Sequence, residues 1–260
     1  MTVRQPTTGE DVVVTVTGGV AEVVLNRPAK HNALSTRMRE DLAATLAWAS
    51  QDPEVRAVTL RGAGPSFCAG QDLREPRGPY PGARVALWTR VHGNLAAAVA
   101  SCAVPTVAGL HGHVLGRGLD VALAADLRIA AEDTRLGYPE VDHAMVVGGG
   151  GARRLVRMVG EARAMEMLLC ARTLDAETAL SWGLVGKVVP AADLEGEVAR
   201  LARSLTARSD LVLYAAKTGV RQATDAPEDA GAWTDTLFNV LSSAARPPAG
   251  TERDDGPAAT

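Results

Sequence analysis

The hydrophobic residues of this chain fall first into short valine-rich runs and then into patterns with helical spacing. Residues 12–16 and 20–25 are two β-branched runs separated by Thr17-Gly18-Gly19, an arrangement that predicts a β-hairpin. After Ser35, a residue suited to cap a helix, hydrophobic residues recur at helical spacing until Asp52-Pro53 ends the pattern. We expect this helix to lie on the sheet.

Strands and helices continue to alternate along the rest of the chain. The patterns predict strands at 55–60, 104–110, 127–130 and 185–189. They predict helices at about 83–101, 155–158, 162–170, 176–182 and 194–205, and an alanine-rich helix that follows the turn to Gly118 and ends at Ala125. Alternation of this kind predicts an α/β fold, and helices dominate after Gly151. Residues 74–82, rich in proline, glycine and charge, predict a surface loop.

The length of 260 residues, 47% of them hydrophobic, is enough for one domain with appendages. We expect a core in residues 1–190 and a helical region in residues 191–245 that serves oligomerisation, where Leu237, Phe238 and Val240 suggest an interface. Residues 246–260 contain proline, glycine and charge with little to bury, so we expect a disordered tail.

Charge, cysteines and hydropathy exclude several classes of protein. A net charge of -3 gives no field that would attract nucleic acid or an anionic membrane surface. The three cysteines form no CxxC pair and predict neither a zinc site nor disulfides. No hydrophobic run approaches the roughly 18 to 20 residues of a membrane span, and the N-terminus does not resemble a signal peptide. We therefore expect a soluble, cytoplasmic protein that binds any anionic ligand locally.

Two glycine-containing segments could expose backbone N–H groups to a ligand. In Phe67-Cys68-Ala69-Gly70-Gln71-Asp72-Leu73, small residues let a ligand approach the main chain, although a strand exit packed with small residues is the ordinary alternative. The segment His111–Asp120 is a glycine-rich turn that enters a helix, whose first N–H groups are unpaired and bind anions. The anion is either a phosphate or the oxygen of a polarised thioester. Val121 departs from the dinucleotide-binding fingerprint and no P-loop is present, which weakens the phosphate option.

Two acids accompany these segments. Asp120 lies in the first turn of the predicted helix, and Glu140 follows another glycine-containing turn. Taken singly, each is more often a helix-start residue or a solvated loop charge. Together in one cleft they could share the roles of general acid and general base.

The chain resembles the enoyl-CoA hydratase/isomerase (crotonase) family from Val12 to about Val189. The resemblance rests on five stretches: Asn26-Arg27-Pro28 with Lys30, Asn32, Ala33 and Leu34; FCAGQDL at 67–73; HGHVLGRGLDVALAADLRIA at 111–130; Tyr138-Pro139-Glu140-Val141 with the glycines at 148–151; and Trp182-Gly183-Leu184-Val185. It implies a crotonase-like ββα-repeat core with a helical C-terminal region. It also implies homotrimers or dimers of trimers.

The resemblance implies a role for each matching position. The N–H groups of Gln71 and Arg117 would form the oxyanion hole, and Asp120 and Glu140 would be the catalytic acids. The substrate and its CoA moiety would contact Arg27, Lys30, Ala33, Leu34, Ala69, Gln71, Asp72, Leu73 and Gly116. The substrate would be an acyl-CoA thioester, with no metal or further cofactor.

The sequence departs from the family pattern at two of these positions. Asp120 stands where typical hydratases carry Glu, and Arg117 stands where Gly is usual. The leading prediction is hydration of a 2-enoyl-CoA or the reverse dehydration. The alternatives are double-bond isomerisation with Glu140 as the proton shuttle and, from another class, acyl-CoA binding with weak catalysis. The sequence does not specify the acyl chain.

Three further groups of residues are expected to be structural. Histidines 31, 111, 113 and 143 are predicted to be polar loop residues, and Cys68 is predicted to be a packing residue. Arg153, Arg154 and Arg157 are predicted to solvate a helix face rather than to join the site.

Overall fold

The structure is a computed structural model that describes residues 9–75 and 95–223. The chain divides into two compact units, residues 1–208 and 209–260. Helix α8 (Leu194–Thr206), which we expected in the C-terminal region, falls within the first unit. The expected boundary at residue 190 and the oligomerisation role remain predictions. Leu237, Phe238, Val240 and the tail at 246–260 lie outside the described residues.

A six-stranded sheet forms the frame of the first unit. Its strands are ordered β1 (Val12–Thr17), β2 (Val20–Leu25), β3 (Ala57–Gly62), β4 (Thr106–Leu110), β6 (Leu127–Ala131) and β9 (Lys187–Val189). The predicted hairpin is confirmed: β1 and β2 are antiparallel, and Gly18 and Gly19 turn the chain with φ of 57° and 79°. The other neighbouring strands are parallel.

A smaller sheet of three strands was not predicted. It consists of β5 (His113–Leu115), β7 (Arg135–Gly137) and β8 (Leu174–Asp175) in the order β5-β7-β8. Strands of two or three residues are too short to show a hydrophobic period, and β5 lies inside the segment that we interpreted as a turn. This small sheet matters because the chain leaves it directly into the candidate site.

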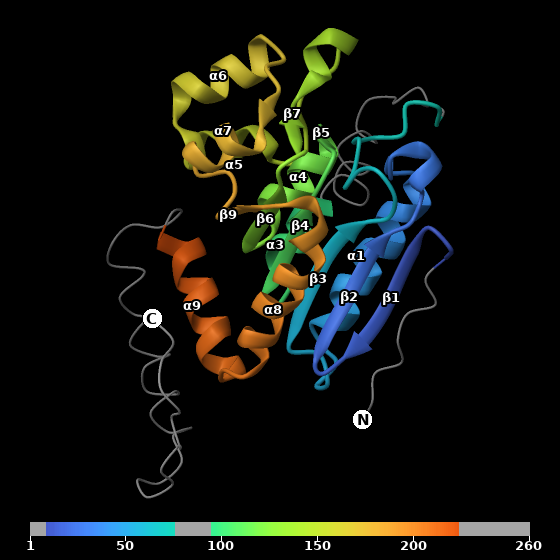
Figure 1. Ribbon diagram of the computed structural model, residues 1–260, viewed down its shortest axis with the longest axis vertical. Helices are drawn as coiled ribbons and strands as arrows, with labels where there is room; N and C mark the ends of the chain where they lie inside the picture. The colour runs from blue at the N-terminus through green and yellow to red at the C-terminus, as the bar shows by residue number, and fades with distance from the viewer. Residues whose placement is uncertain (1–8, 76–94, 224–260) are drawn as a thin grey trace, which may run out of the picture. The chain divides into compact units, whose positions relative to one another are not determined.

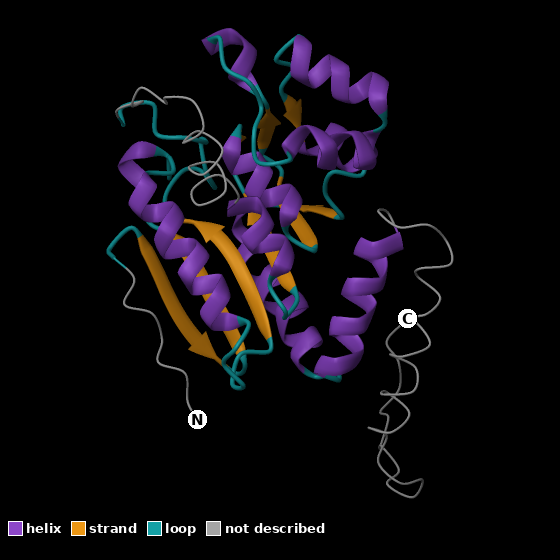
Figure 2. Ribbon diagram, turned by 180° about the vertical axis from the view of Figure 1, so that it is seen from behind, coloured by secondary structure: helices purple, strands orange, loops and turns teal. Residues whose placement is uncertain are grey.

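Helices cover both faces of the six-stranded sheet (Figures 1 and 2). On one side, α1 (Thr36–Ala49), α3 (Leu95–Ser101) and α4 (Arg117–Ala124) pack in succession over the main hydrophobic core. The predicted cap is confirmed, since the Ser35 hydroxyl accepts the N–H of Met38 at 3.1 Å. On the other side, α8 packs on β3, β4 and β6 around Val107, Ile129 and Val198.

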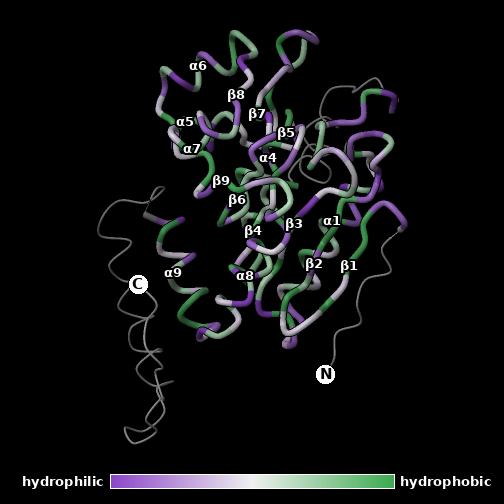
Figure 3. Tube along the Cα trace, in the orientation of Figure 1, coloured by the Kyte–Doolittle hydropathy of each residue, from purple (hydrophilic) through white to green (hydrophobic). Residues whose placement is uncertain are grey.

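The remaining helices of the first unit follow the glycines at 148–151. They are α5 (Gly151–Val159), α6 (Glu161–Leu169) and α7 (Ala176–Ser181), so α5 starts four residues before the predicted 155. Of the helix predicted at 83–101, the structure describes α3 alone; residues 83–94 lie outside the described part. Hydrophobic residues concentrate along the strands, whereas the helices alternate between hydrophobic and hydrophilic residues (Figure 3).

The second unit contains α9 (Asp210–Ala223), which lies within the helical region expected at 191–245, although no individual helix was predicted at these residues. Across both units, none of the described helices combines the length and the hydrophobicity that crossing a membrane requires.

Candidate active site

The small sheet brings Asp120 and Glu140 to the same place. Strands β5 and β7 run parallel, with Leu115 opposite Gly137, and the N–H of Gly116 donates to the carbonyl of Gly137 at 2.9 Å. Because parallel strands end at the same edge, the chain leaves both strands in the same direction. After β5 it enters α4, which carries Asp120, and after β7 it enters the 3-10 helix η2 (Pro139–His143), which carries Glu140.

The segment at 68–73 lies against the start of α4. Cys68 forms a bridge with Val114, in which its N–H donates to the carbonyl of His113 and its carbonyl accepts the N–H of Leu115, both at 3.0 Å. Gly118 permits this approach, because a Cβ there would lie 2.3 Å from the Cys68 carbonyl oxygen. The two segments that the sequence singled out are therefore neighbours.

Two backbone N–H groups are available at this junction. Within the described part of the chain, no group accepts a hydrogen bond from the N–H of Gln71 or of Arg117. Arg117 is the first residue of α4, and the residue before it, Gly116, has φ of 51° and no side chain to cap the helix. A Cβ on Gly70 would lie 3.5 Å from the Arg117 nitrogen, which shows how closely the two loops approach. Uncapped N–H groups at a helix start favour a negatively charged oxygen.

Both acids are buried, with 3% of Asp120 and 8% of Glu140 exposed. The Tyr138 hydroxyl donates to Oδ1 of Asp120 at 2.8 Å. Among the described residues, neither Oδ2 of Asp120 nor Oε2 of Glu140 has a hydrogen-bond partner. Buried carboxylate oxygens without a partner are unusual, and a water molecule or a substrate is the usual explanation.

The surroundings raise the pKa of both acids. Burial raises the pKa of Asp120 to about 7, helped by the charge of Glu140 and opposed by the Tyr138 hydrogen bond and by Arg117 and Arg154. Burial also raises the pKa of Glu140, and Arg117 opposes this rise. The pKa of Tyr138 lies well above its ordinary value because the hydroxyl is buried beside Asp120. An acid that titrates near neutral pH can both accept and release a proton during turnover.

Three residues beside Asp120 were not on the predicted site. Tyr138 belongs to one of the stretches that resemble the family, but the resemblance assigns it no role. At Gly151, a Cβ would lie 1.8 Å from Oδ1 of Asp120, so only glycine leaves room for the carboxylate. Arg154 corrects our expectation of a solvated residue: it is half-buried, donates to the carbonyl of Gly149 at 2.9 Å and lowers the pKa of Asp120. The turn from the glycine run into α5 was not visible in the hydrophobic pattern.

The residues assigned to the CoA moiety form a connected turn. Arg27 donates through Nη1 to Oδ2 of Asp72 at 2.9 Å and to the carbonyl of Ala33 at 2.6 Å. Burial raises the pKa of Asp72, but hydrogen bonds from Arg74 and Arg27 outweigh this effect and leave the pKa below its ordinary value. Leu34 forms a bridge with Gln71, so the turn is joined to the first N–H donor. The pairing of Arg27 with Asp72 gives both residues a structural function beside any contact with CoA.

The other predicted contact residues differ in exposure. Lys30 and Leu73 are exposed, Ala69 is half-buried, and Gly116 is buried against Oε1 of Glu140. Contact of these residues with CoA remains a prediction.

Cys68 is a buried residue beside the two loops. Burial raises the pKa of its thiol to about 12, and the sulfur lies 3.1 Å from the carbonyl oxygen of Asn32. A thiol in this environment does not form the thiolate that nucleophilic catalysis requires. These contacts fit the predicted packing role.

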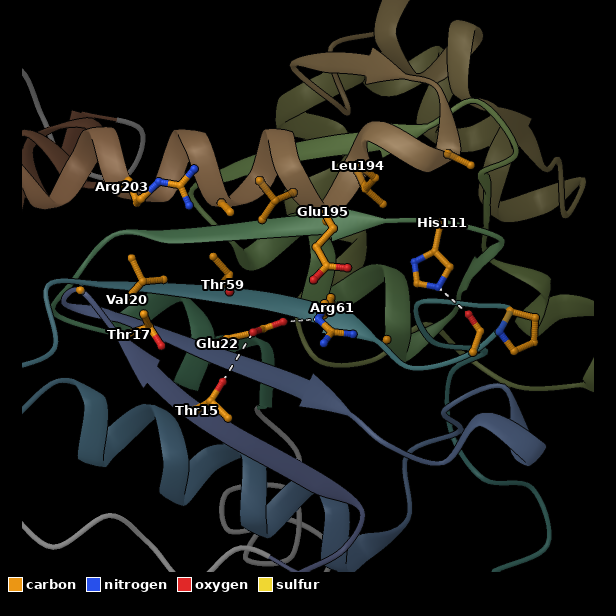
Figure 4. Close-up of a pocket in the computed structure, with 18 of the residues that line it drawn as sticks. Thr15, Thr17, Val20, Glu22, Thr59, Arg61, His111, Leu194, Glu195 and Arg203 are labelled. Atoms are coloured by element: carbon orange, nitrogen blue, oxygen red, sulfur yellow. Dashed lines mark hydrogen bonds and ion pairs between the residues drawn. The ribbon is translucent and has the colours of Figure 1, made fainter.

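Hollows in the described part of the chain differ in whether they include an acid of the site. A small cavity is lined by residues at and near the starts of three helices: Leu34 and Arg39 (α1), Leu95 and Ala96 (α3), and Arg117, Asp120 and Val121 (α4), together with Gly149. A larger groove lies between the sheet and α8, and Figure 4 shows Glu22, Arg61, His111 and Glu195 along it. The groove contains neither Asp120 nor Glu140.

Comparison with known proteins agrees with this geometry. The profile of the enoyl-CoA hydratase/isomerase family matches residues 15–245. A probable enoyl-CoA hydratase, echA8 of Mycobacterium bovis, is 34% identical over 217 residues, which are 83% of each chain. The (E)-benzylidenesuccinyl-CoA hydratase of Thauera aromatica is 34% identical over 232 residues, 88% of this chain and 90% of the relative.

Solved structures show the same likeness. The crystal structure of a putative enoyl-CoA hydratase from Streptomyces coelicolor A3(2) superposes with a TM-score of 0.86 at 32% identity, covering 92% of this chain and 89% of the other. The predicted crotonase-like α/β fold with a helical C-terminal part is thus confirmed. This protein belongs to the enoyl-CoA hydratase/isomerase family.

Proposed function

We propose that this enzyme adds water to the double bond of a 2-enoyl-CoA thioester, or catalyses the reverse dehydration. The observation that carries the proposal is the pair of buried acids, each with an unpartnered oxygen, beside two backbone N–H groups that lack an acceptor. A water molecule between the unpartnered oxygens of Asp120 and Glu140 would satisfy both. That position suits attack on a substrate whose thioester oxygen binds the two N–H groups.

In the proposed reaction, the N–H groups of Gln71 and Arg117 hold the thioester oxygen. Attack of water on the β carbon moves the electrons of the double bond towards that oxygen, which becomes an enolate. The two hydrogen bonds strengthen as the charge develops, so they stabilise the transition state more than the ground state. Loss of one such donor typically costs about 3 kcal/mol of transition-state stabilisation.

The two acids would carry one proton between them. The Tyr138 hydroxyl donates to Asp120 and so favours its anionic form, which makes Asp120 the base that accepts a proton from water. Glu140 then holds the shared proton and donates it to the α carbon. The proton taken from water remains on Asp120, and transfer between the acids restores the starting state. Such a pair titrates as a unit rather than as two independent groups.

The proposal agrees with the comparisons, since both relatives described above are named as hydratases of CoA thioesters. We also propose that catalysis needs no metal or cofactor beyond the CoA of the substrate. Among the described residues, no group of three or more potential metal ligands was found. Assembly into homotrimers or dimers of trimers and a cytoplasmic location remain predictions.

Double-bond isomerisation is the second candidate, favoured by the short side chain at position 120. Asp120 is held by Tyr138 and Gly151 leaves it no spare room, so its reach towards a water molecule is restricted. In that case Glu140 alone would move a proton between the α and γ carbons. Acyl-CoA binding with weak catalysis is the alternative from another class.

Hydration of crotonyl-CoA by the wild type, Asp120→Asn and Glu140→Gln separates these candidates. For a hydratase, we expect both substitutions to lower kcat by roughly 100-fold to 10,000-fold, the usual contribution of acid-base groups. Glu22→Gln, in the groove under α8, is the control and should keep wild-type activity. Loss in the Glu140 variant alone, with consumption of a 3-enoyl-CoA, indicates an isomerase. Tight binding of CoA esters without turnover of either substrate indicates a binding protein.

A further inference from the structure

Arg117 brings a positively charged side chain to a position where the proposed oxyanion hole needs only a backbone N–H. A glycine, which has no side chain, would supply that N–H equally well. Arg117 is the first residue of α4 and is half-buried. Partial burial of a guanidinium group removes some of its hydration, which is unfavourable unless charges or hydrogen bonds compensate for it. The side chain of Arg117 therefore requires an explanation of its own.

The guanidinium group lies beside the glycine run that leads into α5. A Cβ built on Gly148 would lie 3.7 Å from Nη2 of Arg117, and one built on Gly151 would lie 1.8 Å from Oδ1 of Asp120. The N–H of Gly151 donates to the carbonyl of Gly148 at 3.0 Å, so both contacts belong to one tight turn. Arg117 and Asp120 are also three residues apart on α4, a spacing that places side chains on the same face of a helix. The cation and the carboxylate thus lie against the same turn.

Glu140 also lies close to Arg117. A Cβ on Gly116, the residue directly before Arg117, would lie 2.6 Å from Oε1 of Glu140. The positive charge lowers the pKa of Glu140 as well as that of Asp120. Among the described residues, however, no acid or carbonyl receives a hydrogen bond or an ion pair from this guanidinium group. Arg117 therefore acts on both acids through its charge, while its side-chain N–H groups remain without an acceptor.

Other charged and titratable groups face the acid pair from several elements. They are Tyr138 and His143 around η2, Arg154 in α5 and Arg39 in α1. Arg154 donates to the carbonyl of Gly149 and Arg39 donates to the hydroxyl of Thr36, both at 2.9 Å. Of the three arginines, Arg117 is the one whose side chain donates to no described residue. Its charge is therefore the one available to a reacting group.

The proposed hydration moves one negative charge through the site. The charge starts on Asp120, passes to the enolate oxygen when Asp120 accepts the proton of water, and ends on Glu140 when Glu140 protonates the α carbon. Exclusion of water makes a charge unfavourable at each of these places. A cation close to all three offsets this cost, and a guanidinium group does not release its proton in proteins. The enolate oxygen would be bound by the N–H of the same residue.

We propose that the guanidinium group of Arg117 balances the negative charge that moves between Asp120, the enolate oxygen and Glu140. The inference deepens the proposed hydration and rests on it for the enolate. It gives Arg117 two functions, since its backbone N–H binds the oxygen and its side chain supplies the compensating charge. The side chain takes no part in the proton transfers.

Substitutions that keep the backbone N–H test the side chain by itself. Arg117→Met and Arg117→Gln remove the charge, whereas Arg117→Lys keeps it. Without the cation, the pKa values of both acids rise, so the acidic limb of kcat/KM against pH for crotonyl-CoA hydration should move upwards by about 1 to 2 units. At pH 7 we expect kcat/KM to fall roughly 10-fold or more in both neutral variants and to be largely retained in Arg117→Lys. Arg203→Met, which removes an exposed arginine of the groove under α8, should keep the wild-type profile.

Binding of acetoacetyl-CoA separates this inference from the proposed reaction. This ester loses a proton from the carbon between its two carbonyl groups and forms an enolate that absorbs in the near ultraviolet, without turnover. We expect the ester bound to the wild type to form the enolate at a pH lower by about 1 unit or more than the ester bound to Arg117→Met or Arg117→Gln. The value for Arg117→Lys should lie near that of the wild type.

The outcomes distinguish failure of the inference from failure of the proposed function. The expected difference in enolate formation, without hydration of any enoyl-CoA, would reject the reaction and keep the role of Arg117. Enolate formation at the same pH in the wild type and in a folded neutral variant would overturn the inference, even if the wild type hydrates crotonyl-CoA. Failure of the wild type to bind the ester would reject both. Circular dichroism shows which variants fold, and either neutral variant is sufficient for the comparison.

Discussion

The groove under α8 and the small cavity beside α4 both contain carboxylates, but the carboxylates differ in burial and in hydrogen-bond pairing. In the groove, Glu22 forms an ion pair with Arg61 and accepts a hydrogen bond from Thr15. Asp120, which lines the cavity, and its neighbour Glu140 are buried and keep unpartnered oxygens among the described residues. The groove is the larger hollow, yet Glu22 within it is already paired. Incomplete pairing of buried groups, rather than the size of a hollow, therefore locates the chemistry.

Glu197 in α8, an acid paired with two cations at the protein surface, extends this contrast. Hydrogen bonds from Arg200 and Lys187 lower the pKa of Glu197 to about 2, whereas burial raises the pKa of Asp120 to about 7. The same functional group is thus held anionic on the surface and near its titration point in the cavity. A buried acid with a pKa near neutrality contributes nothing to the stability of a cavity, and such perturbed pKa values cluster at functional sites.

The largest effect in this comparison is expected from Gly151→Ala. A Cβ at this position would lie 1.8 Å from Oδ1 of Asp120, so the carboxylate must move away from Tyr138. We expect a fall in kcat/KM of roughly 100-fold, as for other displacements of about 1 Å in an active site. Steady-state hydration kinetics measure it.

Gly196→Ala, in α8 beside the groove, is the matched control. A Cβ there has no atom within 4 Å among the described residues, and alanine favours the helix by roughly 0.5 to 1 kcal/mol. Activity should stay within about twofold of wild type, and the thermal midpoint should rise slightly. Wild-type activity of Gly151→Ala would show that the position of Asp120 is not critical.

A second difference should appear in stability as a function of pH. The pKa of Asp120 rises from 3.8 to about 7 on folding, so the folded state binds more protons between these values and the free energy of unfolding falls as pH rises through that window. Asp120→Asn removes this loss. Between pH 4 and pH 8, we expect the free energy of unfolding of the variant to rise by on the order of 2 kcal/mol relative to that of the wild type. Each pKa unit corresponds to about 1.4 kcal/mol, and the figure is reduced because relaxation of the structure weakens the effect of burial.

Urea unfolding at several pH values measures this gain. Glu22→Gln, which removes the paired acid of the groove, should show no comparable increase. A stability difference between Asp120→Asn and wild type that does not change with pH would mean that folding does not raise the pKa of Asp120.

Sequence patterns were sufficient to predict the main sheet and its covering helix, but not the short strands that lead into the site. The hairpin at Gly18-Gly19 and the helix capped by Ser35 depend on local interactions, which the sequence displays directly. Strands β5 and β7 have three residues each and gain their stability from pairing with each other, so no local period reveals them. The family resemblance indicated Asp120 and Glu140, but the physical reason for their proximity is that pairing.

The residues that were missed act through space rather than through a motif. Arg154 resembled its neighbours Arg153 and Arg157 in sequence, and only the turn before α5 brings it towards Asp120. The burial of Arg39, which lines the small cavity, was also missed, because a charged residue in a helical pattern is expected to face solvent. A charge on the inward face of the helix period was the available signal, since Met38 and Leu42 mark that face.

The smallest expected effect compares the two hydroxyl groups that donate to carboxylates. Tyr138 donates to buried Asp120 at 2.8 Å, and Thr15 donates to half-buried Glu22 at 3.5 Å. The Tyr138 bond favours the anionic form of Asp120, so Tyr138→Phe should raise its pKa further. If Asp120 must be ionised to accept a proton, the acidic limb of kcat/KM against pH should move upwards by about 1 unit, since a hydrogen bond to a charged group contributes about 1.5 kcal/mol. Thr15→Val should leave the profile unchanged. A downward or absent shift in Tyr138→Phe would contradict the assignment of Asp120 as the base, because a base that has lost a donor to its anion titrates at higher pH.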